Sequence, residues 1–302
     1  MIASFNDLFA ELKAKKICKK LVVAWGVDEH SIEAAYKAAE AGFVEATLVG
    51  DEATIKQVCA DNNIDVNDFT IIQEADENKA AAKACEIINN GEGDILMKGL
   101  LSTDKYMRAI LNKERGLMPG PKAVLSHVTV IETPRYHKLI ICGDVAIIPA
   151  PDLNQKIAIT NYLVNTARAL QIEKPKVAVL AATEQVLPAM PACVDACIIS
   201  KMAERGQIKN AVIDGPLGVD LAIDMECVQI KKVKSEVAGD ADCIVFPNIE
   251  TGNVFYKCNT KLAGAELGAM VVGAKVPCVL SSRGDSTKTK LYSIALAAAV
   301  AK

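Results

Sequence analysis

The stretch "LVVAWGVDEHSIEAAYKAAEAGFVEATLVG", Leu21–Gly50, decides the fold class. It begins with a β-rich apolar run at Leu21–Gly26, continues with a helical pattern at Ser31–Ala41, and ends with a second β-rich run at Glu45–Gly50. Ser31 is expected to cap the helix, because serine favours this position. Two strands joined by such a helix are typical of a parallel βαβ unit. The stretch therefore predicts an α/β protein.

The same alternation continues along the chain. Helices are expected at 54–62, 79–89 and 103–113, and strands at 69–73 and 94–98. This rhythm favours a mostly parallel sheet with helices on both faces.

The rhythm changes after the Pro/Gly loop "LMPGPK". Three β-rich runs follow closely, at 123–132, 138–142 and 146–149. They leave no room for crossover helices, so we expect them to be antiparallel and place a domain boundary near them. The α/β alternation then resumes. Its expected elements are a helix at 153–169, a strand at 176–181, a helix at 189–205, strands at 211–214 and 243–246, a helix at 253–268, a strand at 278–280 and a final helix.

Composition limits the class of protein. A chain of 302 residues suggests about two domains, and its net charge of −3 makes a broad nucleic-acid-binding surface unexpected. The ten cysteines are scattered, and the one close pair, Cys193 and Cys197, has no histidine cluster beside it, so no metal site is expected. Abundant reduced cysteine favours a cytoplasmic location. We also expect no signal peptide and no membrane span, because no sufficiently long apolar run occurs.

Four strand ends combine polar side chains with glycine or proline. Ligands in open α/β sheets bind just beyond the carboxyl ends of the strands. Glycine lets backbone N–H groups approach a ligand, and helix N-termini add partial positive charge. Four such ends together predict a ligand cleft. They are Met97–Asp104, Ile213–Asp220, Phe246–Asn253 and Leu280–Ser286.

The last of these ends, "LSSRGDS", holds the strongest candidate for binding an anion. Arg283 presents a fork of donors that suits a phosphate or a carboxylate. Ser286 or Asp285 is expected to cap the final helix. Lys288 and Lys290 lie in its first turn, where the helix dipole disfavours cations, and are typical of a solvated helix face.

Other reactive groups are scarce. His30 and His127 have no neighbour that suggests a catalytic triad, and His137 lies between the antiparallel runs. The sequence contains no G-x-x-x-x-G-K-[ST], G-x-G-x-x-G or G-x-S-x-G motif. Nucleotide kinases, dinucleotide-binding Rossmann enzymes and α/β-hydrolases therefore lose support.

Four longer segments are similar to one known family. "SEVAGDADCIVFPNIETGNVFYK" (Ser235–Lys257) and the downstream "VPCVLSSRGDS" resemble the phosphate acetyl/butyryl transferases. "MKGLLSTDKYMRAIL" and "HVTVIETPRYHKLIICGDVAIIPAPDLNQK" resemble the phosphate butyryltransferase branch. The resemblance implies an acyltransferase that interconverts acyl-CoA and orthophosphate with acyl phosphate and CoA.

The resemblance also implies an architecture. The family fold is like that of isocitrate and isopropylmalate dehydrogenases, with two α/β domains of mostly parallel sheets around an interdomain cleft. Residues 1–127 and 272–302 would form domain I, and residues 128–271 would form domain II. A homodimer or larger homo-oligomer is expected. No cofactor is expected, because coenzyme A is a substrate, and neither nucleic acid nor membrane is expected as a partner.

Catalytic roles follow from the same resemblance. Arg283 would hold the phosphoryl group, and Ser282 would donate to the carbonyl oxygen as it becomes negative. The acetyltransferase branch has an aspartate where this chain has Thr289, so the general base is in doubt. Asp285 is the nearest carboxylate along the chain and is the candidate we name.

Further residues are expected to bind the substrates. From one domain these are Lys98, Gly99, Ser102 and Thr103, and from the other Asp214, Gly215, Asn248, Thr251, Gly252 and Asn253. Arg135 and Lys257 are candidate partners of the CoA phosphates.

Three alternatives stay open. Asp214, Asp220 and Asp224 could belong to a metal-dependent decarboxylating dehydrogenase, although the arginines that such an enzyme needs are missing. A non-catalytic module that senses CoA or acyl phosphate would explain Thr289. A phosphate acetyltransferase acting on acetyl-CoA is the third alternative. Motifs at the phosphate end do not report the acyl pocket, and one methylene changes discrimination by only about 1–3 kcal/mol.

Overall fold

The computed structural model describes residues 2–281 and 285–302. The chain forms two compact units. We name the units by their place along the chain. The outer unit comprises the two flanking stretches Phe5–Leu125 and Gly268–Lys302, and the central unit comprises the middle stretch Ser126–Leu267 with the residues up to Ser4. The predicted domain bounds, at 127/128 and 271/272, stay a prediction.

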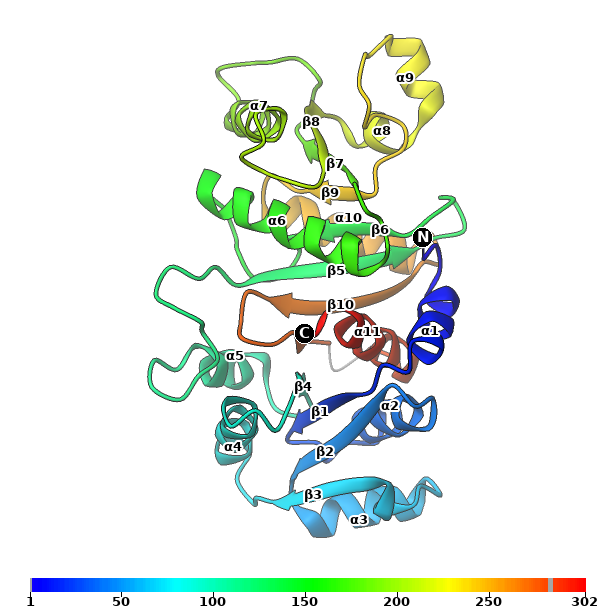
Figure 1. Cartoon of the computed structure of the whole chain (residues 1–302), viewed down its shortest axis with the longest axis vertical. Helices are drawn as coiled ribbons and strands as arrows, with labels where there is room; N and C mark the ends of the chain where they lie inside the picture. Colours follow the sequence, from blue (N-terminus) through cyan, green and yellow to red (C-terminus); the bar gives the residue numbers. More distant parts are fainter. Residues whose placement is uncertain (1, 282–284) are drawn as a thin grey trace. The chain divides into compact units, whose positions relative to one another are not determined.

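The outer unit is built on a six-stranded portion of sheet with the order β3-β2-β1-β4-β11-β10 (Figure 1). Its strands run parallel except β10, which is antiparallel to β11. Buried parallel strands need apolar residues on both faces, and Leu21–Ala24 in β1 are fully buried. The strands are β1 (Lys19–Ala24), β2 (Val44–Gly50), β3 (Phe69–Gln73), β4 (Ile95–Lys98), β10 (Glu266–Val272) and β11 (Cys278–Val279).

Helices cover both faces of this sheet. Helices α1, α2, α3 and α11 lie on one face, and α4 and α5 lie on the other (Figure 1). The bounds are α1 (Phe5–Ala14), α2 (Glu29–Glu40), α3 (Glu52–Asp61), the short 3-10 turn η1 (Val66–Asp68), α4 (Glu77–Asn89), α5 (Thr103–Leu111) and α11 (Thr287–Val300).

The central unit carries the strand order β5-β6-β9-β7-β8. Strands β5 and β6 are antiparallel, as the close spacing of their β-rich runs predicted, and the other pairs are parallel. Its strands are β5 (Ser126–Glu132), β6 (Ile140–Gly143), β7 (Lys176–Leu180), β8 (Val212–Leu217) and β9 (Cys243–Val245). Its helices are α6 (Leu153–Ala169), α7 (Pro191–Glu204), α8 (Val219–Ile223), α9 (Met225–Lys231) and α10 (Ile249–Lys261).

Three local predictions were wrong. Helix α2 is capped by Asp28, which accepts from the Ser31 backbone N–H at 3.0 Å, and not by Ser31. The run 146–149 forms no strand, because the N–H groups of Ala146 and Ile147 donate to the Asp144 carboxylate. The helix expected at 253–268 is two elements, because α10 begins at Ile249 and ends at Lys261 before β10.

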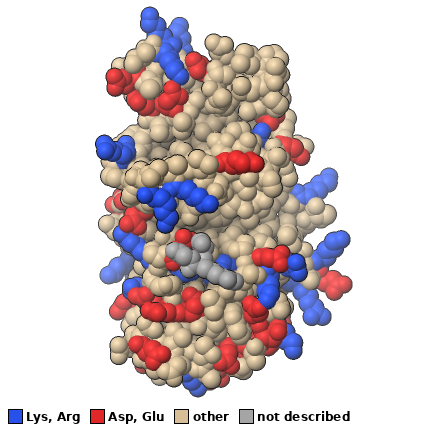
Figure 2. All heavy atoms as spheres, turned by 180° about the vertical axis from the view of Figure 1, so that it is seen from behind, with Lys and Arg blue, Asp and Glu red and all other residues tan. Residues whose placement is uncertain are grey.

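The surface charge is mixed. On the face drawn in Figure 2, Lys and Arg side chains occur in small groups among Asp and Glu side chains. This mixture agrees with the net charge of −3 and forms no continuous basic face in that view. No helix among the described residues is long and apolar enough to cross a membrane. No group of three His, Cys, Asp or Glu side chains in the described ranges could hold a metal ion.

Candidate active site

Three helix N-termini gather at the carboxyl edge of the outer sheet. Strands β1, β4 and β11 are parallel neighbours, and α2, α5 and α11 follow them along the chain. Asp28, Ser102 and Ser286 cap these helices. The confirmed cap at Ser286 accepts from the Thr289 N–H at 3.2 Å. Each N-terminus presents backbone N–H groups and partial positive charge, so this edge suits an anion.

Lys98 ends β4 and is only 1% exposed. Its ammonium donates to the carbonyl oxygens of Gly99 at 3.0 Å and Leu101 at 3.1 Å. Gly99 itself sits against the Trp25 carbonyl, where a side chain would collide. Lys98 therefore shapes the turn between β4 and α5.

Ser102 and Thr103 complete this turn. The Ser102 hydroxyl accepts from the Lys105 N–H at 3.3 Å, and Thr103 is the exposed first residue of α5. The structure thus brings the four predicted residues of this strand end together at the start of one helix.

The end of β11 holds a buried lysine that sequence reasoning placed on a solvated face. Lys290 is 2% exposed, and its Nζ lies 3.0 Å from the Ser281 Oγ. Burial lowers the pKa of Lys290, and the charges of Asp28 and Asp285 oppose that shift. The predicted catalytic residues Ser282 and Arg283 lie outside the described residues. Of the predicted catalytic residues, Asp285 is described and is half-buried.

His30 has partners that its sequence neighbours did not reveal. Its Nδ1 lies 3.4 Å from the Thr287 Oγ1, and the Thr287 hydroxyl donates to Glu33 Oε2 at 2.7 Å. Hydrogen bonds from Lys37 and then Thr287 lower the pKa of Glu33. These contacts arise because α2 and α11 pack together. They do not form a catalytic triad, because the hydroxyl donates to the carboxylate and the imidazole does not lie between the two groups.

The carboxyl edge of the central unit is organised by Asp144, which directly follows β6 and is 2% exposed. Its carboxylate accepts four hydrogen bonds, from the Ser126 hydroxyl at 2.9 Å and from the N–H groups of His127, Ala146 and Ile147 at 3.1, 2.7 and 2.8 Å. Sequence reasoning missed this residue. The polar "GD" that ends an apolar run was the available signal.

Helix α10 begins beside Asp144. Asn248 caps it by accepting from the Thr251 N–H at 2.9 Å and hydroxyl at 2.6 Å. Gly252 packs directly on the Asp144 carbonyl, and Asn253 donates to the Val145 carbonyl at 3.2 Å. Two of the four predicted residues of this strand end, Gly252 and Asn253, therefore contact the residues that follow β6, and the other two form the cap of α10.

Asp214 and Gly215 do not follow their strand. They lie inside β8, which continues to Leu217, and the Asp214 carboxylate accepts from the Gly215 N–H at 2.8 Å. Both line a separate cavity of about 840 Å³ with Lys174 and Lys234. The expectation that they end a strand was wrong.

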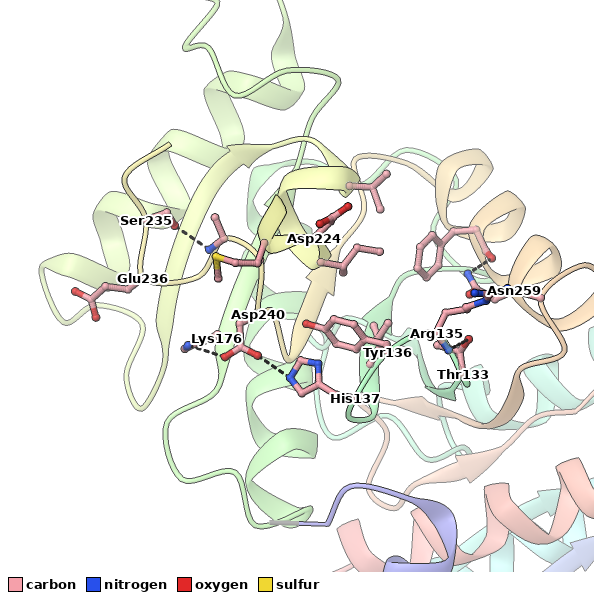
Figure 3. Close-up of a pocket in the computed structure, with 18 residues that line it drawn as sticks. Thr133, Arg135, Tyr136, His137, Lys176, Asp224, Ser235, Glu236, Asp240 and Asn259 are labelled. Atoms are coloured by element: carbon pink, nitrogen blue, oxygen red, sulfur yellow. Dashed lines mark hydrogen bonds and ion pairs between the residues drawn. The ribbon is translucent and has the colours of Figure 1, made fainter. Parts of the chain in front are cut away.

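Arg135 and Lys257 are also apart from the carboxyl edge. Arg135 lines a cavity of about 1040 Å³ with Tyr136, His137 and Asn259 (Figure 3). This cavity lies at the amino ends of the parallel strands, because Lys176, which starts β7, also lines it. Lys257 is exposed in the second half of α10.

The whole chain matches proteins of one kind. Residues 4–83 and 74–298 match the family described as phosphate acetyl/butaryl transferase. The chain belongs to this family. Among this family's members, the phosphate butyryltransferase of Clostridium acetobutylicum is 46% identical over 301 residues, covering 100% of this chain and 99% of that protein.

Two further relatives extend the comparison. The phosphate acetyltransferase of Rhizobium meliloti is 40% identical over 277 residues, covering 92% of this chain and 87% of that protein. The crystal structure of a branched-chain phosphotransacylase from Enterococcus faecalis V583 matches with a TM-score of 0.80 and 30% identity, covering 93% of this chain and 99% of that one. The α/β fold with a mostly parallel sheet is therefore shared with a phosphotransacylase.

Proposed function

We propose that this enzyme, of the phosphate acyltransferase type, interconverts acyl-CoA and orthophosphate with acyl phosphate and CoA, and that butyryl-CoA is its acyl donor. The observation that carries the proposal is the 46% identity across the full chain to a phosphate butyryltransferase. The acetyltransferase cited above is less similar, at 40%. Neither identity reports the volume of the acyl pocket, so acetyl-CoA is the alternative donor.

The proposed reaction has two chemical requirements. Starting from acyl phosphate, a base takes the proton of the CoA thiol, the sulfur bonds to the carbonyl carbon, the bond from that carbon to the phosphate oxygen breaks, and the proton ends on the departing phosphate. The reverse sequence consumes butyryl-CoA and orthophosphate. The departing phosphate needs an anion clamp, and the oxygen of the tetrahedral intermediate needs a donor. We assign the clamp to Arg283 and the donor to Ser282.

The described residues support these roles by their placement. Ser281 and Ser286 flank the proposed catalytic segment in the chain, at the edge where α2, α5 and α11 begin. An incoming phosphate would meet backbone N–H groups there without a metal ion. Lys98 and Ser102 hold the neighbouring turn, and Asn248 and Asn253 hold the corresponding edge of the central unit.

The larger architecture is part of the proposal. We assign the two-domain plan of isocitrate and isopropylmalate dehydrogenases, with an interdomain cleft and no cofactor, to this chain. The homo-oligomer rests on the same resemblance, and the cytoplasmic location rests on the ten scattered cysteines.

The dehydrogenase chemistry itself is disfavoured by the aspartates. Asp220 lies in α8 and accepts from Lys231 at 2.8 Å, whereas Asp224 caps α9. Asp214 lies within β8. These three carboxylates have separate partners, and no group of three His, Cys, Asp or Glu side chains among the described residues could hold a metal ion, so they do not form the ligand set of a divalent ion.

The deciding experiment follows free thiol release by the purified protein with acetyl-, propionyl- and butyryl-CoA, with and without phosphate and in the presence of a chelator. Phosphate-dependent release with the highest kcat/KM for butyryl-CoA is expected. A highest kcat/KM for acetyl-CoA would replace the proposed donor. No release with any of the three, from folded protein that binds CoA, would favour the sensing module instead.

A further inference from the structure

Lys290 is a buried, charged side chain that does not cap its helix, because Ser286 does so. It lies in the first turn of α11 and is 2% exposed, and its ammonium lies 3.0 Å from the Ser281 hydroxyl. Lys288, two residues earlier, is exposed and lies over the Tyr292 ring at 5.6 Å. The two lysines share a helix turn and differ in burial, so they form a natural pair for comparison.

The position of Lys290 is energetically unfavourable on two counts. Burying an ammonium removes its hydration, and a cation in the first turn of a helix opposes the helix dipole. Replacing such a group by an apolar side chain of similar volume is often neutral or stabilising. Stability alone therefore does not account for a lysine here.

The start of α2, the helix that packs against α11, contains further buried polar atoms. Asp28 caps α2 through Oδ1, which accepts from the Ser31 N–H at 3.0 Å. Among the described residues, the second carboxylate oxygen of Asp28 and the hydroxyl of Ser31 are buried without a hydrogen-bond partner. The negative charge of Asp28 opposes the burial that lowers the pKa of Lys290, and the Ser281 hydroxyl accepts a hydrogen bond from this ammonium.

We propose that Lys290 is a positioning residue for acyl transfer that acts through the Ser281 hydroxyl. Ser281 is joined by a peptide bond to Ser282, so the contact with Lys290 fixes the point from which the proposed catalytic pair begins. The proposal rests on the proposed function, since it assigns catalytic importance to that pair. Lys290 makes no contact with the reacting atoms in this role.

The test compares Lys290→Met, which keeps the chain length and removes the charge, with Lys288→Met as the matched control. Lys290→Met is expected to lower kcat about 100-fold, as expected when catalytic groups shift by about 1 Å, with the KM for CoA changed less than about twofold. Its melting temperature is expected to equal or exceed that of the wild type, because a buried charge has been removed. Lys288→Met should retain wild-type kinetics.

Two further variants separate positioning from packing. Ser281→Ala should lower kcat, and adding it to Lys290→Met should cost little more, because both remove one contact. Lys290→Arg, which keeps the charge, should recover part of the lost kcat. A kcat for Lys290→Met within twofold of Lys288→Met would overturn the proposal, as would a loss explained entirely by unfolded protein.

The contact is also tested without turnover. In ¹⁵N-lysine-labelled protein, the Lys290 ammonium resonance, assigned by its absence in Lys290→Met, should shift in Ser281→Ala and in Asp28→Asn. An unchanged resonance in both variants would refute the contact. An inactive wild type would refute the proposed function instead, so the two failures are distinguishable.

Discussion

At the scale of single residues, most of the polar side chains at the carboxyl edges are committed to the backbone. Lys98 binds two carbonyl oxygens of its own turn, Asp144 accepts four hydrogen bonds, and Asn248 caps α10. Their hydrogen bonds shape the loops that end the strands. A phosphate also needs a planar fork of donors, and Arg283 is the residue to which we assign that role.

Replacing Arg283 tests that assignment. Arg283→Ala should raise the KM for phosphate and lower kcat/KM by about 100-fold, which corresponds to about 2.7 kcal/mol of transition-state stabilisation. Arg283→Lys should recover only part of the loss, because a lysine lacks the planar fork. Steady-state kinetics with varied phosphate measure both effects. Arg205→Ala, at the carboxyl end of α7, is the control, and wild-type kinetics for Arg283→Ala would remove Arg283 from the site.

The general base is a second question at this scale. If Asp285 removes the thiol proton, Asp285→Asn should flatten the acidic limb of the pH profile of kcat/KM for CoA, while Asp285→Glu should preserve the limb. His30→Gln belongs in the same series, because His30 contacts Thr287 in the first turn of α11. A wild-type profile for Asp285→Asn would rule Asp285 out as the general base. A flattened profile for His30→Gln would assign the general base to His30.

At the scale of elements, the start of α10 is fixed against the end of β6. Gly252 lies in the first turns of α10, where alanine would ordinarily favour the helix by about 1 kcal/mol. Here an added methyl group would collide with the Asp144 carbonyl and crowd the Phe246 ring. The packing conflict therefore outweighs the helix propensity.

Gly252→Ala should accordingly lower the free energy of unfolding by about 1–3 kcal/mol, the usual cost of overpacking. Denaturant unfolding followed by circular dichroism measures it. Gly120→Ala is the matched control, because open space surrounds Gly120. An equally stable Gly252→Ala would mean that α10 shifts without cost.

A cluster of ion pairs joins the starts of three strands of the central unit. Asp240 lies 2.9 Å from the Lys138 ammonium and 2.7 Å from that of Lys176, and Lys138 also reaches Asp242 at 2.7 Å. Burial alone would raise the pKa of Asp240, but the hydrogen bonds from Lys176 and Lys138 outweigh it and lower the pKa to about 2. These residues precede or begin β6, β7 and β9.

The lowered pKa makes stability depend on acid. The folded pKa of Asp240 lies below the unfolded value of about 3.9, so its stabilisation is present above pH 4 and is lost as the pH falls through 2. Because the side chain is one-third exposed, we expect about 1–2 kcal/mol, less than the full shift implies.

Asp240→Asn tests this dependence. Its free energy of unfolding should fall by that amount at pH 7, and the difference from wild type should shrink between pH 4 and pH 2. Asp104→Asn, which loses only an exposed ion pair with Arg108, should change little at any pH. A difference that does not depend on pH would show that packing, and not charge, stabilises the cluster.

At the scale of the whole molecule, both units follow one plan. Each has a run of parallel strands bordered by an antiparallel neighbour, and each places capped helix N-termini at its carboxyl edge. Apolar side chains are also exposed on the central unit, including Val194 and Ile198, which lie one helical turn apart on α7. We choose this pair to test for an interface between copies of the chain.

We expect the purified protein to be a homodimer or larger. Light scattering should give at least twice the mass of the 302-residue chain, and Ile198→Asp should reduce it. Leu111→Asp, at an exposed apolar position of the outer unit, is the control. A monomeric wild type would contradict the expected assembly.

The sequence by itself determined the order and type of most elements. The predicted range of α6, 153–169, matches the structure, because Asp152 and Gln155 form a local capping box that marks its start. The strand at 69–73 was likewise predicted to the residue. Periodicity and capping act between residues close in the chain, so they can be read without the fold. Local patterns also predicted the polar segments that follow β4 and β9, which contain Ser102 and Asn248. The resemblance to the family predicted the reaction class.

Only the tertiary structure decided which polar groups meet. Lys290 looked solvated because its neighbours in the sequence are polar, yet the packing of α11 on α2 buries it beside Ser281. Asp144 accepts hydrogen bonds from residues of β5 and of its own loop, and His30 contacts Thr287, which is 257 residues away in the chain. Burial and hydrogen bonding between distant segments depend on how strands are ordered in the sheet, and no local pattern encodes that order.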